Sequence, residues 1–177
     1  MITLEDIEEI KQLKARYCRC VDLKLWPEFR QIFSDDCQYV GTAAAAPGPD
    51  QFVETVAASL VELKSVHHVH NPEIRPLSDD RARGSWSLQD YLFWEKGAHV
   101  PPWLKGSEEQ ISVVGFGLYE EEYQRTVDGW KIARMRLSRL ALIPLFGPGG
   151  CEATLKQVWG DPDPEWIAGG GFKAGAQ

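Results

Sequence analysis

The sequence predicts one α+β domain, in which three helices from the N-terminal half cover a strongly curved, mixed or antiparallel sheet and enclose a pocket. Apolar residues recur at helical spacing up to about residue 63 and alternate with a period of two after it. Helices followed by a long antiparallel meander are typical of α+β chains, whose helices pack on one face of the sheet. Gly115 and Gly117 inside one long strand indicate strong curvature or a bulge. The predicted shape is therefore a cone with one open mouth.

Three helices are expected before the meander. The first begins after a capping box made by Thr3 and Asp6, and it extends to about residue 22. Its apolar face, at helical spacing, consists of Leu4, Ile7, Ile10, Leu13, Tyr17 and Cys20. A short second helix opens at Trp26-Pro27 and ends near residue 34. The third helix takes Asp50 as its N-cap and extends to about residue 63.

Five strands are expected to form the sheet. They are predicted at residues 37–41, 66–74, 82–95, 111–124 and 130–143. Val127-Asp128-Gly129 is typical of a tight hairpin turn, so the last two strands should be antiparallel neighbours.

Two further segments are predicted to act as covers. Residues 97–106 contain Pro101-Pro102-Trp103-Leu104 and form a connection too long for a tight hairpin. The tail after Pro144 is rich in glycine and proline but keeps several large apolar residues. We therefore expect a domain at residues 1–145 and a tail at residues 146–177 that covers the mouth of the pocket or a neighbouring subunit.

Composition and charge limit the possible functions. The chain has 177 residues, a net charge of −7 and no basic stripe, which argues against a nucleic-acid partner. The N-terminus lacks an apolar signal region, and no apolar run reaches the roughly 18 residues of a membrane span, so we expect a cytoplasmic protein that does not contact the membrane. The four cysteines form no CxxC pair, which predicts reduced thiols and neither a metal site nor a disulfide.

Two aspartates stand where apolar residues are expected. Asp22 closes the first helix, where the helix dipole disfavours an acid. Asp90 interrupts an apolar stripe that consists of Trp86, Leu88, Leu92 and Trp94. A carboxylate on an apolar face must be paired or protonated, because burial of an isolated charge is costly. Arg139 could supply the countercharge for Asp90; the alternative is a structural salt bridge at a subunit interface.

Three histidines lie in the run His67-His68-Val69-His70. His67 and Val69 share one face of a strand and the other two histidines share the opposite face, so only one pair can point inward. The histidines could be surface or core residues, metal ligands or acid–base catalysts. A zinc site needs a third protein ligand, and none is apparent, so no metal is expected. In the catalytic interpretation, Asp22 orients His67 and raises its basicity.

At this point the sequence resembles a known family. The segment Ile7-Glu8-Glu9-Ile10-Lys11-Gln12-Leu13-Lys14-Ala15-Arg16-Tyr17, followed by Asp22 and Trp26, resembles the opening of the SnoaL-like branch of the NTF2-like superfamily. Residues 67–74 and Asp128-Gly129-Trp130-Lys131-Ile132 also match that pattern. The resemblance covers residues 4–143 and implies a cone-shaped sheet with three helices and a deep pocket. Within the branch, the chain is most similar to bile acid 7α-dehydratases and more distantly similar to scytalone dehydratases.

The resemblance implies a lyase that needs no cofactor. Its catalytic residues would be Tyr17, Asp22, His67 and Asp90. His67, oriented by Asp22, would remove a proton next to an activating group, Tyr17 would bind the oxygen where charge develops, and Asp90 would protonate or hold the leaving hydroxyl. We further expect the substrate to be bound by Tyr39, Trp86 and Arg139. The expected substrate is a hydrophobic polycyclic molecule of steroid or polyketide type.

One position departs from these dehydratases, and three functional alternatives stay open. A second catalytic tyrosine of the dehydratases falls on Gly41, and Tyr39, two residues earlier on the same strand face, is a candidate replacement. The alternatives are an isomerase of the ketosteroid type, a dehydrohalogenase, and a non-catalytic ligand-binding or assembly domain. The resemblance also implies a homo-oligomer, either a dimer or a trimer.

Overall fold

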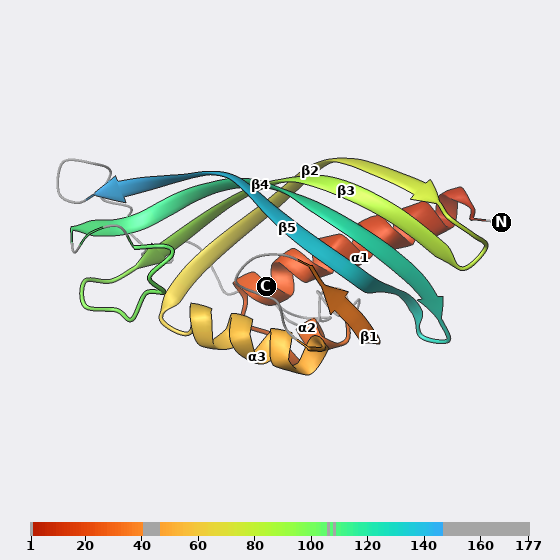
Figure 1. Ribbon diagram of the computed structural model, residues 1–177, viewed down its shortest axis with the longest axis horizontal. Helices are drawn as coiled ribbons and strands as arrows, with labels where there is room; N and C mark the ends of the chain where they lie inside the picture. Colours follow the sequence, from red (N-terminus) through yellow and green to blue (C-terminus); the bar gives the residue numbers. More distant parts are fainter. Residues whose placement is uncertain (1, 41–46, 106, 108, 147–177) are drawn as a thin grey trace, which may run out of the picture.

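The computed structural model describes residues 2–40, 47–105, 107 and 109–146, which form three helices and one five-stranded sheet (Figure 1). The helices are α1 (Leu4–Asp22), α2 (Trp26–Arg30) and α3 (Pro49–Leu60). The strands are β1 (Phe33–Tyr39), β2 (Leu63–Pro76), β3 (Arg81–Trp94), β4 (Gln110–Thr126) and β5 (Gly129–Phe146). The strand order is β1-β5-β4-β3-β2, with β2 to β5 as an antiparallel meander and β1 parallel to β5. The α+β class and the mixed sheet are thus confirmed.

The predicted start of α1 is confirmed, whereas the predicted start of α3 is wrong. Thr3 and Asp6 form the capping box, with the Asp6 backbone N–H donating to Thr3 Oγ1 at 3.2 Å and the Thr3 backbone N–H donating to Asp6 Oδ2 at 2.8 Å. At α3 the N-cap is Gly48, and the helix begins at Pro49, whose missing N–H costs nothing at the first helical position. Asp50 lies in the first turn, where it accepts a hydrogen bond from Arg30 Nε at 2.6 Å.

Strand β1 begins earlier than its sequence pattern predicts. It spans Phe33–Tyr39, whereas residues 37–41 were expected, because Phe33 already pairs with Ile132 of β5. The Ile132 backbone N–H donates to the Ile32 carbonyl at 2.9 Å just before this strand. Gly41, the residue where the dehydratases keep a tyrosine, lies outside the described residues, as does the predicted tail from residue 147 on.

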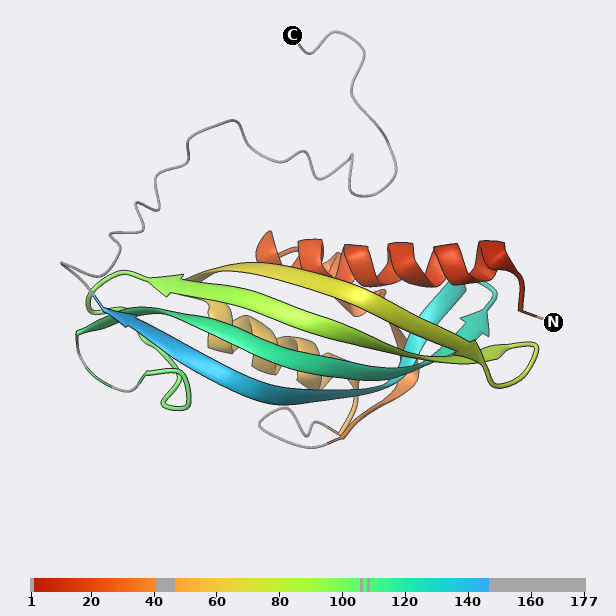
Figure 2. The ribbon, with the colours of Figure 1, turned by 90° about the horizontal axis from the view of Figure 1, so that it is seen from above.

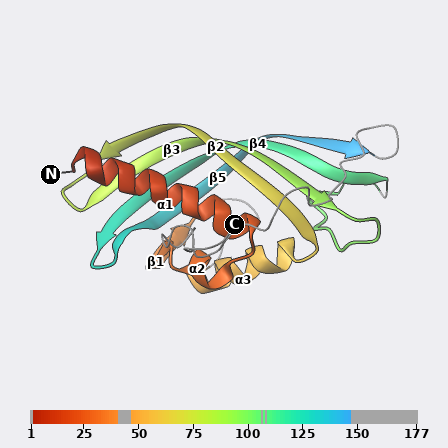
Figure 3. The same ribbon diagram turned by 180° about the vertical axis from the view of Figure 1, so that it is seen from behind.

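All three helices lie on the same face of the sheet (Figures 1 and 3). Figure 2 shows the sheet turned by 90° from the view of Figure 1, with α1 running beside β2. The predicted strong curvature is not confirmed, since the sheet is twisted but not strongly curled. β3 and β4 pair in continuous register past both glycines of β4, while the pairing of β4 with β5 shifts between Phe116 and Gly117. The glycines therefore bring a local bulge, and they do not coil the sheet.

The core fills the space between the sheet and the helices. Tyr17, Phe29, Phe33, Tyr39 and Phe52 form an aromatic cluster whose neighbouring ring centroids lie 3.9 to 6.1 Å apart. Most of these pairs are edge-to-face, the arrangement that the ring quadrupoles favour. Tyr17, Tyr39 and Phe52 of this cluster also line the cavity of the candidate site.

Three of the four cysteines lie in the described part of the chain. Cys18, Cys20 and Cys37 are buried free thiols, and burial raises the pKa of Cys18 and of Cys20 to about 11 and that of Cys37 to about 12. A thiol with a raised pKa is a poor nucleophile at neutral pH. Cys151 lies outside the described residues. None of the helices in the described ranges has the length and apolar character that a membrane span requires.

Candidate active site

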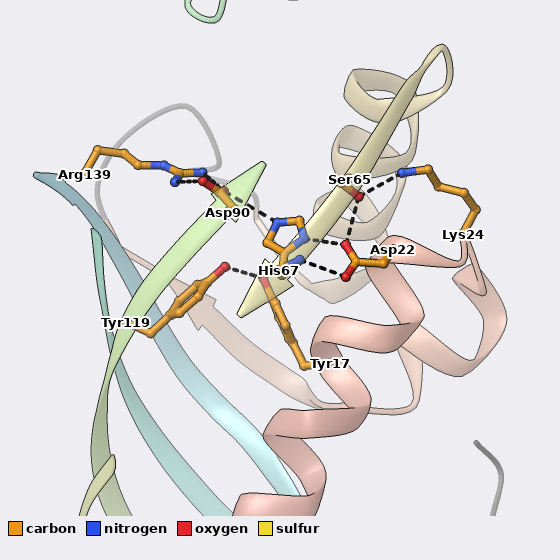
Figure 4. Close-up of polar contacts among 8 residues, drawn as sticks. All are labelled: Tyr17, Asp22, Lys24, Ser65, His67, Asp90, Tyr119 and Arg139. Carbon is orange, nitrogen blue, oxygen red and sulfur yellow. Dashed lines mark hydrogen bonds and ion pairs between the residues drawn. The ribbon is translucent and has the colours of Figure 1, made fainter. Parts of the chain in front are cut away.

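The end of α1 and the middle of β2 place Asp22 beside His67 (Figure 4). The Asp22 carboxylate lies 2.6 Å from His67 Nδ1, and it accepts hydrogen bonds from the His67 backbone N–H at 2.8 Å and from the Ser65 hydroxyl at 2.9 Å. With Asp22 ionised, Nδ1 carries the donated proton, which leaves Nε2 of a neutral imidazole as an acceptor. The dyad predicted from the sequence is therefore assembled, with its tautomer fixed by Asp22.

The run of three histidines divides as strand alternation requires. His67 points inward with its side chain 8 % exposed, while His68 and His70 are exposed on the opposite face with their ring centroids 6.0 Å apart. In the described part of the chain, no group of three or more histidine, cysteine or acidic side chains is arranged to hold a metal ion.

Asp90 and Arg139 form an ion pair on the other side of His67. Asp90 on β3 is fully buried, and Arg139 on β5 donates to both of its oxygens, from Nη1 at 2.8 Å and from Nη2 at 2.6 Å. Burial is the largest single influence on Arg139 and lowers its pKa, but the hydrogen bonds and the charge of Asp90, with smaller contributions from Tyr119 and Tyr17, together raise the arginine pKa. His67 Nε2 lies 3.7 Å from Asp90 Oδ2. The buried carboxylate is thus paired, and the countercharge that the sequence suggested is the one present.

Gly115 makes this ion pair possible, a role that sequence reasoning missed. β4 runs between β3 and β5, and its Gly115 pairs with Asp90 on one side and with Leu142 on the other. A Cβ at this position would lie 2.1 Å from Asp90 Oδ1 and 2.6 Å from Arg139 Nη1, closer than real contacts allow. The signal was present in the sequence as a glycine inside a strand, where close approach of another group is a common reason.

Two tyrosine hydroxyls meet next to the dyad. Tyr17 on α1 and Tyr119 on β4 place their hydroxyl oxygens 3.5 Å apart (Figure 4). Burial is the main cause that raises the pKa of both phenols well above the usual range, so both stay protonated and can donate. Tyr119 was not selected from the sequence, although it shares the inward face of β4 with Gly115 and Gly117.

These polar groups line a cavity of about 210 Å³. His67, Asp90, Arg139 and the two tyrosines form its polar wall. Its apolar wall includes Val21, Phe52, Val56, Leu60, Leu92 and Leu137. Trp103, from the predicted cover between β3 and β4, also lines it. A mainly apolar cavity with a few convergent polar groups is typical of a small-molecule site.

The two other residues expected to bind substrate lie in different places. Tyr39 lines the cavity, with its ring stacked on Phe52 at 3.9 Å and its hydroxyl buried. Trp86 is not one of the residues that line the cavity. It is buried farther along β3, where its indole N–H donates to the Tyr123 hydroxyl at 2.8 Å.

A second buried ion pair lies behind the tyrosines. Lys14 Nζ is 2.5 Å from Glu121 Oε1, and both side chains are fully buried. The ammonium also lies 4.0 Å from the ring centroid of Tyr17 and 3.3 Å from that of Tyr119. Tyr123 donates to the other oxygen of Glu121 at 2.5 Å. This Lys14–Glu121 pair supports the tyrosines from the side away from the cavity.

The chain matches the family model described as a SnoaL-like domain over residues 3–136. Among solved structures, it is similar to hexachlorocyclohexane dehydrochlorinase LinA type 2, with 19% sequence identity, a TM-score of 0.67, and coverage of 84% of this chain and 97% of that one. A LinA-type3 dehydrochlorinase from Novosphingobium barchaimii LL02 has the same identity and TM-score, with coverage of 82% and 93%.

A third structure comes from Novosphingobium aromaticivorans DSM 12444 and is provisionally named a scytalone dehydratase. It has 16% identity and a TM-score of 0.67, and the match covers 87% of this chain and 97% of that one. At such low identities these likenesses establish the shared NTF2-like fold. The more specific similarity to bile acid dehydratases, which was expected from the sequence, is not shown by these structures.

Proposed function

The chain belongs to the SnoaL-like domain family, and on that basis we propose that it is a lyase that needs no cofactor and eliminates water from a hydrophobic ring compound. The observation that carries the proposal is the position of His67. Its Nδ1 is held by Asp22 at 2.6 Å, and its other nitrogen belongs to a side chain that lines the cavity. A base with a fixed tautomer and an acceptor nitrogen toward a mainly apolar cavity is suited to removing a proton from carbon.

The tyrosines supply the electrophilic side of the reaction. When His67 removes a proton next to a carbonyl group, negative charge develops on the carbonyl oxygen. Tyr17 and Tyr119 line the cavity with buried, protonated hydroxyls that can donate to that oxygen. The substrate carbonyl therefore serves as the electron sink, and the chemistry requires no metal or organic cofactor.

The leaving hydroxyl lies on the Asp90 and Arg139 side. The electron pair held on the enolate oxygen then returns to re-form the carbonyl, the enolate C=C pair becomes the new double bond as the C–O bond breaks, and the departing oxygen takes the proton back from the His67 imidazolium to leave as water. Asp90 accepts two hydrogen bonds from Arg139, which suits it to holding a hydroxyl and not to donating a proton. Of the two roles that the sequence left open for Asp90, we therefore propose that of holding the leaving group.

The size of the cavity bears on the substrate. Drug-sized ligands occupy pockets of about 300–1,000 Å³, whereas this cavity has a volume of about 210 Å³. A ring compound with one or two rings fits this volume better than a four-ring steroid. The Tyr39 hydroxyl belongs to a side chain that lines the cavity and supplies a second polar contact, so the preferred substrate carries a second oxygen function.

A dehydrohalogenase is the second candidate, and one observation favours it. A halide leaves as an anion and needs no proton, and the Arg139 guanidinium, with its side chain 22 % exposed, offers it a positive partner. Solved dehydrochlorinases share the fold of this chain. In this reaction His67 would pass its proton to solvent after each turnover.

The test compares histidines on opposite faces of one strand. Purified protein is assayed with cyclic β-hydroxyketones, polychlorinated cyclohexanes, steroid alcohols and a ketosteroid isomerase substrate, after a thermal-shift screen of the same compounds. We expect a hydroxyketone to be turned over and both His67→Ala and Asp22→Asn to reduce kcat by about 10²–10⁴-fold. His68→Ala, on the exposed face, is the control and should keep full activity.

Each other result selects another function. Turnover of chlorinated rings alone would establish the dehydrohalogenase, and a shifted double bond without loss of water would establish the isomerase. Ligand binding without turnover of any compound would indicate a binding domain. Full activity in both His67→Ala and Asp22→Asn would contradict the assignment of the dyad.

A further inference from the structure

A chain of hydrogen bonds continues from Asp22 away from the cavity. Lys24 Nζ donates to Ser65 Oγ at 3.3 Å, and the Ser65 hydroxyl donates to Asp22 Oδ1 at 2.9 Å, the oxygen that also contacts His67 Nδ1 (Figure 4). An ammonium group can only donate, so Ser65 must accept from Lys24 and direct its own hydrogen at Asp22. Lys24 thereby fixes the orientation of the Ser65 hydroxyl. This hydroxyl is buried, since Ser65 is only 6 % exposed.

Lys24 adopts an unusual backbone conformation to make this contact. Its φ is 59°, in the left-handed region, and it follows Leu23, the C-cap of α1. Glycine is the usual residue at this position after a helix, because it takes the left-handed conformation without strain. The lysine ammonium lies 5.8 Å from the ring of Trp26, and the side chain is half-buried. A lysine in this strained conformation, with its ammonium hydrogen-bonded to a neighbour of the dyad, points to a role for the charge.

The charges around His67 explain what the ammonium could do. The imidazole lies between two carboxylates, with Nδ1 2.6 Å from Asp22 and Nε2 3.7 Å from Asp90. Negative charge beside an imidazole in general opposes its neutral form, and only the neutral form can accept a proton from substrate. Arg139 is bound to the far side of Asp90, and Lys24 reaches the far side of Asp22 through Ser65.

Three further titratable groups near the dyad are neutral at neutral pH, and the Lys14–Glu121 pair behind the tyrosines balances its own charge. Tyr17 and Cys18 come from α1, and Tyr119 comes from β4. Burial raises the pKa of each of them, so none of the three adds a charge. The charge state of the site therefore depends on two carboxylates, two cations and His67.

We propose that Lys24 and Ser65 are positioning residues that keep His67 in its neutral, proton-accepting form by offsetting the charge of Asp22. The proposal rests on the function proposed above, in which His67 is the base. It assigns Lys24 on one side and Arg139 on the other as matched cations, one for each carboxylate.

The experiment measures the titration of the His67 imidazole by NMR and the pH dependence of activity. The imidazole of His67 is titrated by NMR in the substrate-free protein, and its signal among the four histidines is identified by its loss in His67→Asn. Lys24→Gln should raise the midpoint of that titration by about half to one pH unit. The acidic limb of the pH profile of kcat/KM should move to higher pH by the same amount. At pH values on that limb kcat/KM should therefore fall about three- to tenfold, while its value on the alkaline plateau stays unchanged. Ser65→Ala should move both in the same direction by less.

Three variants separate this charge effect from a structural one. Lys24→Gly relieves the left-handed backbone, so it should be as stable as the parent protein while showing the same shift as Lys24→Gln. Lys24→Arg should restore the parent midpoint. Lys11→Gln removes an ammonium that is paired with Glu8 at 3.3 Å on the exposed face of α1, and it should shift nothing.

The outcomes are distinct. An unchanged titration midpoint in both Lys24→Gln and Lys24→Gly would overturn the proposal. A uniform loss of activity at all pH values, together with a lower melting temperature, would also overturn it in favour of a structural role. A shifted midpoint in a protein that turns over none of the tested compounds would support the Lys24–Ser65 chain while the lyase proposal fails.

Discussion

Two buried ion pairs lie on the same face of the sheet, yet they are enclosed in different ways. Lys14 and Glu121 are both 0 % exposed, and neither lines the cavity. Asp90 is equally buried, but its partner Arg139 is 22 % exposed and both residues line the cavity. A buried charge whose neighbours are all protein groups can only stabilise or position the fold. A buried charge that faces a cavity can interact with a ligand as well. The difference indicates that access, and not burial, separates the structural pair from the functional one.

The largest expected effect comes from breaking the enclosed pair. Glu121→Gln keeps the shape of the side chain but leaves the Lys14 ammonium without a counterion in a fully buried position. We expect a loss of about 3–5 kcal/mol in the free energy of unfolding, measured by urea denaturation. The double variant Lys14→Met/Glu121→Gln removes both charges and should recover most of that loss. A double variant as unstable as the single one would show that the charge is not the cause.

Gly115→Ala tests the pair that faces the cavity. The new methyl group would lie 2.1 Å from Asp90 Oδ1, so the carboxylate and Arg139 must move away from His67. We expect kcat/KM to fall about 10- to 100-fold, because displacement of reacting groups by about 1 Å has effects of this size. The control is Gly84→Ala, whose nearest contact is a Tyr123 ring carbon at 3.1 Å, away from the ion pair. Equal activity in both variants would contradict the role given to Gly115.

Asp90→Asn compares the two pairs on one scale. The substitution also leaves a cation without its carboxylate, but Arg139 retains access to water through the cavity. We expect a loss of about 1–2 kcal/mol in the free energy of unfolding, between the values typical of exposed and of buried pairs. The same denaturation series as for Glu121→Gln gives the measurement. A loss as large as that of Glu121→Gln would show that access to the cavity does not relieve the unpaired charge.

The smallest effect is expected at Asp6, whose partner lies near the surface. Arg125 binds Asp6 at 2.6 Å and, with the Thr3 backbone N–H, holds the pKa of Asp6 well below its usual range. A lowered pKa gives stability that is present above the unfolded-state value of about 3.9 and is lost as the pH falls below it. Asp6→Asn should therefore be less stable than the parent at pH 7, with the difference shrinking below about pH 4. Urea denaturation across this range measures it, and Glu5→Gln, an exposed neighbour, should show no such trend.

Local patterns predicted much of the fold. The capping box at Thr3 and Asp6, the turn at Val127-Asp128-Gly129 and the alternation of β2 to β5 all depend on neighbouring residues, and all are confirmed. Predictions that depend on distant partners did less well. β1 begins at Phe33 because it pairs with β5, and Gly115 of β4 makes room for the Asp90 and Arg139 side chains.

The sequence by itself determined which residues carry an unfavourable free energy of burial that a partner must offset. Asp22 at a helix end, Asp90 in an apolar stripe and His67 in a histidine run could all be selected from local pattern, because burial of a charge is unfavourable wherever it occurs. The tertiary structure alone decided how the cost is met. Arg139 lies 49 residues from Asp90, Ser65 lies 43 residues from Asp22, and Glu121 lies 107 residues from Lys14. Sequence reasoning named Arg139 as a candidate partner but neither Ser65 nor Glu121, because strand register and helix packing bring these groups together.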